Sequence, residues 1–284
     1  MAEGSEIAAL VALLRHGKRD WSRYTTVLET ERSAWPMLQE EQGLLAPNLA
    51  EAASAEIERW RGAGYRLLTV LDAGYPDNLR AVHDRPPLLF VAGNYQASDA
   101  RSVAVIGSRN ASPAGLDLAR QIAGHLSEDG YTIVSGLARG IDTAAHLATL
   151  ERGGRTIAVL GTGLAHTYPA ANAELQARIA RDCAVLSQFW PDAPPTRRSF
   201  PMRNAVMSGL TLGTVIVEAG ERSGARTQAR IALTHGRPVL LMPRLLTQNW
   251  AQVLAQRPGT HVVRSVAEIG GLVSRLSSDV ALVE

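Results

Sequence analysis

Glycine, serine and arginine recur in four short segments, each directly after an apolar run that predicts a buried strand. Glycine lets the backbone approach a ligand closely, and arginine supplies a planar cation that binds phosphate through paired hydrogen bonds. Helices that begin after such segments add free N–H groups and a partial positive charge. The pattern therefore predicts an anion site, and its candidate residues are Gly107, Ser108, Arg109, Ser135, Gly136, Arg139, Gly140, Gly161, Ser223 and Gly224.

A second basic group surrounds an aromatic residue. Arg197, Arg198 and Arg203 flank Phe200, and Asn204 follows directly. Phosphates need positive charge and bases need a stacking face, so this combination suits a single-stranded nucleic acid. The alternative is a solvated loop with one buried phenylalanine.

Other chemistries lack their motifs. The Gly-x-Gly-x-x-Gly fingerprint of dinucleotide sites does not follow the first strand, and no P-loop is present. The sequence has neither His-Glu-x-x-His nor a close pair of cysteines for zinc. Ser135, Asp142 and His146 could suggest a catalytic triad, but the Gly-x-Ser-x-Gly elbow is missing and His146 is better explained by packing. We expect no catalytic residues, no metal and no cofactor.

Two other functions stay open. A nucleotide-binding sensor or nucleoside-phosphate hydrolase could use the same loops, with Glu218 or Asp142 as acid or base. Asp142 would also be favoured simply as a carboxylate at the start of a helix. The protein could instead be a scaffold that docks partners on its acidic N-terminal helices.

The elements that must hold these loops alternate regularly from Val103 onward. Short apolar runs near 103–106, 132–134, 156–160, 184–186, 214–217 and 238–241 are separated by helical patterns. This alternation predicts right-handed βαβ units and a doubly wound, mostly parallel α/β sheet. In such sheets ligands bind beyond the carboxyl ends of the strands, where the winding reverses, so the four loops should meet there.

The chain divides into three expected parts. Residues 1–65 predict a small helical domain, in which Asn48 is a candidate N-cap; residues 66–100 form a connecting segment with edge strands; residues 101–284 form the α/β domain. Residues 1–100 hold 10 basic and 14 acidic side chains, whereas residues 101–284 hold 19 and 13, so positive charge gathers in the later domain.

The composition is that of a globular protein, with 46% hydrophobic and 20% charged residues. No apolar run is long enough to span a bilayer, no signal peptide is visible at the start, and the one cysteine, Cys183, excludes an internal disulfide. We expect a cytoplasmic protein with no membrane partner.

Several of these segments together resemble the DNA-processing protein A family, also called DprA or Smf. The resemblance is carried by Val-Ala-Val-Ile-Gly-Ser-Arg at 103–109, Ser-Gly-Leu-Ala-Arg-Gly-Ile-Asp at 135–142, Phe-Pro-Met-Arg-Asn at 200–204 and the Ser-Gly pair at 223–224. It covers about residues 65–265, and its long central segment is highly specific. The helical start resembles the sterile-alpha-motif-like (SAM-like) domain that often precedes this fold.

The resemblance implies an extended Rossmann-like domain that binds single-stranded DNA without sequence specificity and performs no covalent chemistry. It implies protection of incoming strands in natural transformation, loading of the RecA recombinase, and a homodimer. The family's basic pocket corresponds to Ser108 and Arg109, with Arg139 and Arg203 nearby. This chain departs from the family pattern at Ala170 and Ala171, where a basic residue is common, and we expect no C-terminal winged-helix domain.

Overall fold

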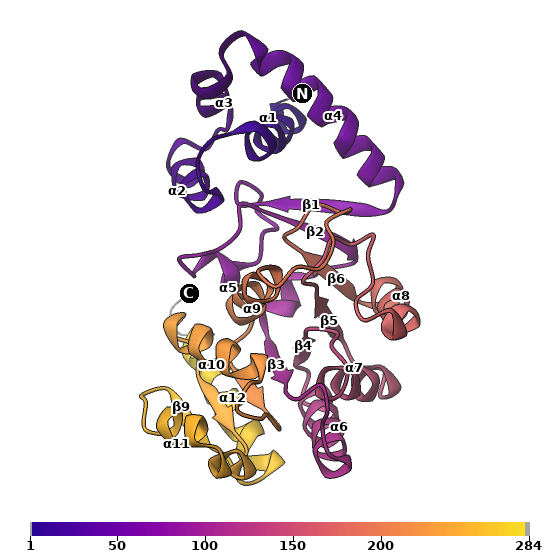
Figure 1. Cartoon of the computed structure of the whole chain (residues 1–284), viewed down its shortest axis with the longest axis vertical. Helices are drawn as coiled ribbons and strands as arrows, with labels where there is room; N and C mark the ends of the chain where they lie inside the picture. Colours follow the sequence, from indigo (N-terminus) through magenta and orange to yellow (C-terminus); the bar gives the residue numbers. More distant parts are fainter. Residues whose placement is uncertain (1, 282–284) are drawn as a thin grey trace.

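A nine-stranded sheet forms the centre of the protein (Figure 1). The structure is a computed structural model that describes the backbone of residues 2–281. Its strand order is β1-β2-β6-β5-β4-β3-β7-β8-β9. The strands are β1 (Tyr65–Thr69), β2 (Leu88–Gly93), β3 (Ser102–Ile106), β4 (Thr132–Ser135), β5 (Thr156–Val159), β6 (Ala184–Ser187), β7 (Thr214–Ile216), β8 (Val239–Leu241) and β9 (Thr260–Val262).

Parallel pairing joins all seven strands from β3 to β9, which confirms the expected fold class. β1 and β2 form an antiparallel pair, and β2 joins the edge of the parallel sheet next to β6. This antiparallel pair extends the sheet beyond β6. The central strands are continuous buried runs because helices cover both faces of the sheet.

The winding direction reverses beside β3. From β3 the chain moves outward through β4 and β5 to β6, and then returns to place β7 on the other side of β3. The loops after β3 and β7 therefore leave the same edge of the sheet in opposite directions. This is the point at which an open α/β sheet has room for a ligand.

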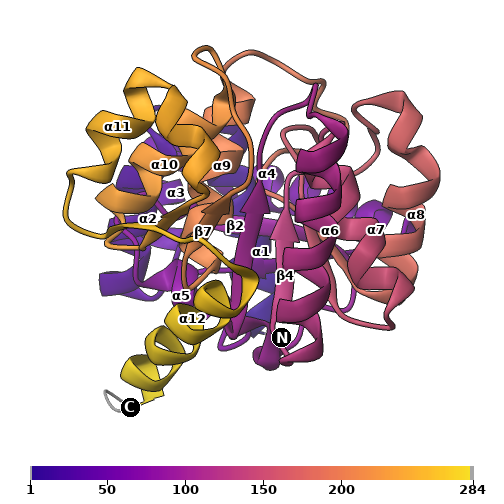
Figure 2. The same cartoon turned by 90° about the horizontal axis from the view of Figure 1, so that it is seen from below.

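Helices cover the two faces of the sheet (Figures 1 and 2). One face carries α6 (Pro113–Glu128), α7 (Ile141–Glu151) and α8 (Ala173–Asp182), and the other carries α9 (Ser199–Leu210), α10 (Gly224–Thr234) and α11 (Asn249–Ala255). The last helix, α12 (Val266–Ala281), contacts α6. Short helical segments are α5 (Asp77–Arg80), η1 (Gly43–Leu45), η2 (Ala97–Ala100), η3 (Ala170–Asn172) and η4 (Pro243–Thr247). No helix within residues 2–281 combines the length and apolarity that a bilayer crossing requires.

Four helices precede the sheet, namely α1 (Ala2–His16), α2 (Trp21–Glu31), α3 (Trp35–Gln42) and α4 (Ala46–Gly62). α1 packs against α3 and α4, and α4 leads directly into β1 (Figure 1). The expected cap at Asn48 is wrong, because α4 already begins at Ala46. Pro47 lies in its first turn, where proline's missing N–H costs nothing.

An aromatic cluster joins these helices to the sheet. Trp190 makes an edge contact with Trp21 and stacks on Trp60, with ring centroids 5.5 and 5.7 Å apart. Phe90 of β2 contacts both Trp60 and Trp190, and the guanidinium of Arg15 lies 4.1 Å from the Trp190 ring centroid. Large aromatic rings bury much apolar area, so this cluster is a main source of adhesion between the helices and the sheet.

Replacing Trp190 should therefore weaken the whole assembly. We expect Trp190→Ala to lower the free energy of unfolding by about 3 kcal/mol, because three ring contacts and a cation–π contact are lost together. Leu44→Ala is the control, since Leu44 is 98% exposed and its loss should change stability by about 0.5 kcal/mol or less. Urea unfolding measures both variants, and equal losses would contradict the role of the cluster.

Candidate nucleic-acid interface

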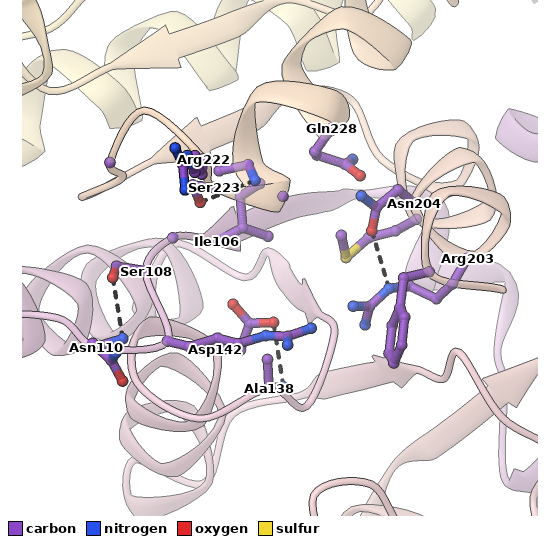
Figure 3. A pocket seen from close by; sticks show the side chains of 17 residues that line it. Ile106, Ser108, Asn110, Ala138, Asp142, Arg203, Asn204, Arg222, Ser223 and Gln228 are labelled. Carbon is purple, nitrogen blue, oxygen red and sulfur yellow. Dashed lines mark hydrogen bonds between the residues drawn. The ribbon is translucent and has the colours of Figure 1, made fainter. Parts of the chain in front are cut away.

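A cavity of about 470 Å³, here called the switch-point crevice, lies where the winding reverses. The loops after β3 and β7 form opposite sides of it, and α9 and the start of α10 close it (Figure 3). Eight of the residues predicted from the sequence line it, namely Gly107, Ser108, Arg109, Phe200, Arg203, Asn204, Ser223 and Gly224.

The carboxylate of Glu218 fixes the two loops relative to each other. It accepts hydrogen bonds from the backbone N–H of Ser112, at 2.9 Å, and from the Ser112 hydroxyl, at 2.6 Å. The Glu218 carbonyl also accepts the N–H of Ser108, at 2.6 Å. Ser112 caps α6, so one glutamate joins the end of β7 to the start of that helix. Its carboxylate is thus engaged in holding the crevice open.

Arg203 lines the crevice but is almost completely buried. Only 6% of the residue is exposed, and its Nη1 donates to the carbonyls of Gly136, at 2.5 Å, and Val159, at 2.8 Å. Burial lowers the pKa of this guanidinium, and the nearby Asp142 carboxylate acts in the opposite direction. A side chain at Gly136 would collide with the guanidinium, which explains the glycine there.

Asp142 organises the loop between β4 and α7. Its Oδ2 accepts hydrogen bonds from the N–H groups of Gly136, at 3.1 Å, and Ala138, at 3.4 Å. Burial raises the pKa of this carboxyl group, whereas the charge of Arg203 and the N–H donors favour its ionised form. Both carboxylates that could serve as acid or base therefore bind backbone groups of the loops.

Three polar residues of the crevice were missed by the sequence analysis: Asn110, Arg222 and Gln228. Gln228 is 1% exposed, and neither atom of its amide has a hydrogen-bond partner among the described residues. It lies beside Asn204, across the crevice from Ser108 (Figure 3). Its position four residues after Gly224 places it on the same helix face, and that spacing could have revealed it.

A smaller hollow of about 280 Å³, here called the side pocket, adjoins the crevice and shares Arg109, Phe200 and Arg203 with it. Gly136 and Arg139, two further predicted residues, line it together with Tyr168. The Arg109 guanidinium lies 5.4 Å from the centroid of the Phe200 ring, and Tyr168 contacts the same ring at 5.6 Å. One exposed cation and two aromatic rings thus separate the two hollows.

The remaining predicted residues line neither hollow. Ser135 is buried and its hydroxyl donates to the carbonyl of Val105, so it joins β4 to β3. Gly140 has φ of 80° and lies against the Ser108 carbonyl, while Gly161 leaves room for the Phe200 ring. Arg197 and Arg198 are exposed on the loop before α9.

The comparisons with known proteins agree with this geometry. Residues 66–270 match the family model described as DNA recombination-mediator protein A. The chain belongs to this family. The family expected from the sequence is confirmed.

Two relatives show the extent of the match. The DNA processing protein DprA of Streptococcus pneumoniae is 44% identical over 175 residues, which is 62% of each chain. The Bacillus subtilis DprA is 34% identical over 193 residues, covering 68% of this chain and 65% of the relative. The chain thus spans less than two thirds of the length of either relative.

Solved structures extend the similarity to the fold. The crystal structure of S. pneumoniae DprA has a TM-score of 0.77 at 31% identity and covers 93% of this chain and 96% of its own. The Helicobacter pylori DprA structure, described as showing a single-stranded DNA binding mode, has a TM-score of 0.66 at 26% identity, covering 76% and 96%.

His146, one turn after Asp142, is completely buried on α7. Thr156 Oγ1 donates to the Ile133 carbonyl, so it must accept the Nδ1–H of His146, at 2.7 Å. The Nε2 atom is then unprotonated and has no partner among the described residues. Burial, together with the charge of Arg203, lowers the pKa of His146 to about 3. This histidine packs as a neutral ring and does not reach the crevice.

The neutral ring makes stability sensitive to acid. The unfolded chain binds a proton at His146 below about pH 6.5, whereas the folded chain does so only near pH 3, so stability falls as the pH drops between these values. We expect the wild type to lose about 2 kcal/mol more than His146→Leu between pH 7.5 and pH 5. Urea unfolding at the two pH values measures this difference. The exposed His261 gives the control: His261→Ala should keep the full loss of the wild type.

Proposed function

We propose that the protein binds single-stranded DNA without sequence specificity, protects incoming strands in natural transformation and loads RecA onto them, without catalysing a covalent reaction. The observation that carries the proposal is the position of Arg109, an exposed cation over the Phe200 ring between the switch-point crevice and the side pocket. It offers charge to a phosphate beside a ring face for a base.

The surroundings of Arg109 fit a strand that passes from one hollow to the other. Arg222 on one side and Arg139 on the other are exposed and can neutralise further phosphates. Phe200 and Tyr168 supply stacking surfaces that accept any base. Such contacts favour an unpaired strand over a duplex, in which the base faces are covered.

The binding function of a relative supports this assignment. The H. pylori DprA structure is described by its mode of binding single-stranded DNA, and it shares the fold of this chain. The absence of catalysis is proposed because Glu218 and Asp142, the two carboxylates considered as acid or base, both accept hydrogen bonds from backbone N–H groups.

The second candidate is a nucleotide-binding sensor or nucleoside-phosphate hydrolase in the same crevice. The unpaired amide of the buried Gln228 favours it, because a buried amide without partners costs free energy that a bound base could recover. The two candidates differ in ligand length: a nucleotide needs only the crevice, whereas a strand also needs the side pocket.

Arg109→Ala should weaken binding to all single-stranded sequences alike. Loss of one phosphate contact should reduce the slope of log affinity against log salt by about 0.7. Arg120→Ala is the control, because Arg120 is an exposed arginine on α6 paired with Asp117. Fluorescence anisotropy with labelled single strands and their duplexes, across a salt series, measures both variants.

An unchanged affinity and salt slope in Arg109→Ala would remove this residue from the interface. Unlabelled mononucleotide, added as a competitor, separates the two candidates. Displacement of the strand by a nucleotide at similar concentration would favour the nucleotide site over the strand site.

RecA loading predicts a kinetic effect. On a single strand covered by single-strand binding protein, the full chain should shorten the lag before RecA filaments grow, and Arg109→Ala should restore the lag. Filament growth is followed by fluorescence of a labelled RecA. An unchanged lag with wild-type protein would exclude loading while leaving strand binding intact.

We also propose that the protein acts as a homodimer. β9 is the outermost strand on its side of the sheet and its residues are partly exposed, and a free strand edge is a natural surface for pairing. Sedimentation equilibrium on the same sample tests this state.

A further inference from the structure

Three side chains with metal-binding atoms meet at a place remote from the switch-point crevice. His83 and Asp84 follow α5 in the connecting segment, and His235 is the C-cap of α10. α10 begins at the crevice with Gly224, so its 11 residues place this cluster roughly 16 Å away along the helix. The proposed DNA interface makes no use of these residues.

The geometry of the cluster suits one small cation. One ligand atom of each residue lies within 4.8 Å of the others, and His235 Nε2 is 2.7 Å from Asp84 Oδ1. The rings of His83 and His235 have centroids 5.5 Å apart. Ligands at about 2.0 Å from a tetrahedral zinc ion lie roughly 3.4 Å from each other. His83 is exposed, so a rotation of its side chain can bring its ring nitrogen from the observed separation to the spacing that a zinc ion requires.

His235 is already held as metal-binding histidines usually are. Its side chain is fully buried, and its Nδ1 lies 3.1 Å from the hydroxyl of Ser208, a buried residue of α9. A hydrogen bond on one ring nitrogen fixes the ring and presents the other nitrogen to the ion. The end of α10 adds partial negative charge from its free carbonyl groups, which also favours a cation.

We propose that His83, Asp84 and His235 form a binding site for a divalent transition-metal ion of the zinc type, with water completing the coordination. Two imidazoles and one carboxylate are a common protein ligand set for zinc with an open fourth position. A metal there would connect the segment before the parallel sheet to the end of α10. Because only the folded chain brings residues 83 and 235 together, the metal would stabilise the fold.

Zinc binding by the full chain, without an affinity tag, tests the site. A chromophoric chelator that competes for Zn²⁺ gives stoichiometry and affinity, and Co²⁺ gives absorption bands that report tetrahedral coordination. We expect one Zn²⁺ per chain. Loss of a hydrogen bond to a metal ligand typically costs about 10–100-fold in metal affinity. Loss of a ligand itself should cost more, so His83→Ala and Asp84→Asn should each weaken Zn²⁺ binding by about 100-fold or more. Both positions are exposed, so neither variant should prevent folding.

His125→Ala is the matched control, because His125 also pairs with a carboxylate, that of Asp129 at the end of α6, and among the described residues no third metal-binding side chain joins that pair. It should bind Zn²⁺ like the wild type. The proposal is overturned if the wild type binds no stoichiometric Zn²⁺, or if His83→Ala and Asp84→Asn bind it as tightly as His125→Ala. In either case the cluster is only a contact between His235 and the carboxylate of Asp84, with His83 beside it. Strand binding by Arg109 is independent of either result.

Discussion

The buried guanidinium of Arg203 holds together the elements that shape the switch-point crevice. From α9 it reaches the backbone carbonyls that follow β4 and end β5, and it faces the carboxylate of Asp142 at the start of α7. A buried charge is costly unless hydrogen bonds satisfy it, and the carbonyls of Gly136 and Val159 do so for Arg203. The loops around the crevice are therefore positioned by a charge that is largely buried in the lining of the crevice.

This constraint divides the arginines of the site into two kinds. Arg203 is buried and donates from Nη1 to two backbone carbonyls and from Nε to the Asn204 side chain, whereas Arg109, Arg139 and Arg222 are exposed. Buried charges fix geometry at a cost in desolvation, and exposed charges can exchange counterions for phosphates. The sequence does not distinguish Arg203 from Arg109 and Arg139, because residue type and loop position do not reveal burial.

The fold could be predicted further than the site. Alternating buried strands and helices were sufficient to predict the parallel sheet, whereas the reversal of its winding beside β3 follows from the strand order in the structure. Glycine and serine after a strand have several physical causes, however. The Ser135 hydroxyl joins two strands, Gly140 adopts a positive φ, and Gly161 leaves room for the Phe200 ring. These roles depend on neighbours distant in sequence, as does the meeting of Asp84 and His235, which lie 151 residues apart.

α10 runs from the switch-point crevice to the cluster of His83, Asp84 and His235. Its first turn, at Ser223 and Gly224, borders the crevice proposed for phosphates, and its last turn presents His235 to Asp84 and His83. A helix has partial positive charge at its N-terminus and partial negative charge at its C-terminus. The proposed anion site and the proposed cation site thus lie at the ends that the helix dipole favours. Because the dipole is a property of the backbone, both preferences follow from the direction in which α10 crosses the sheet.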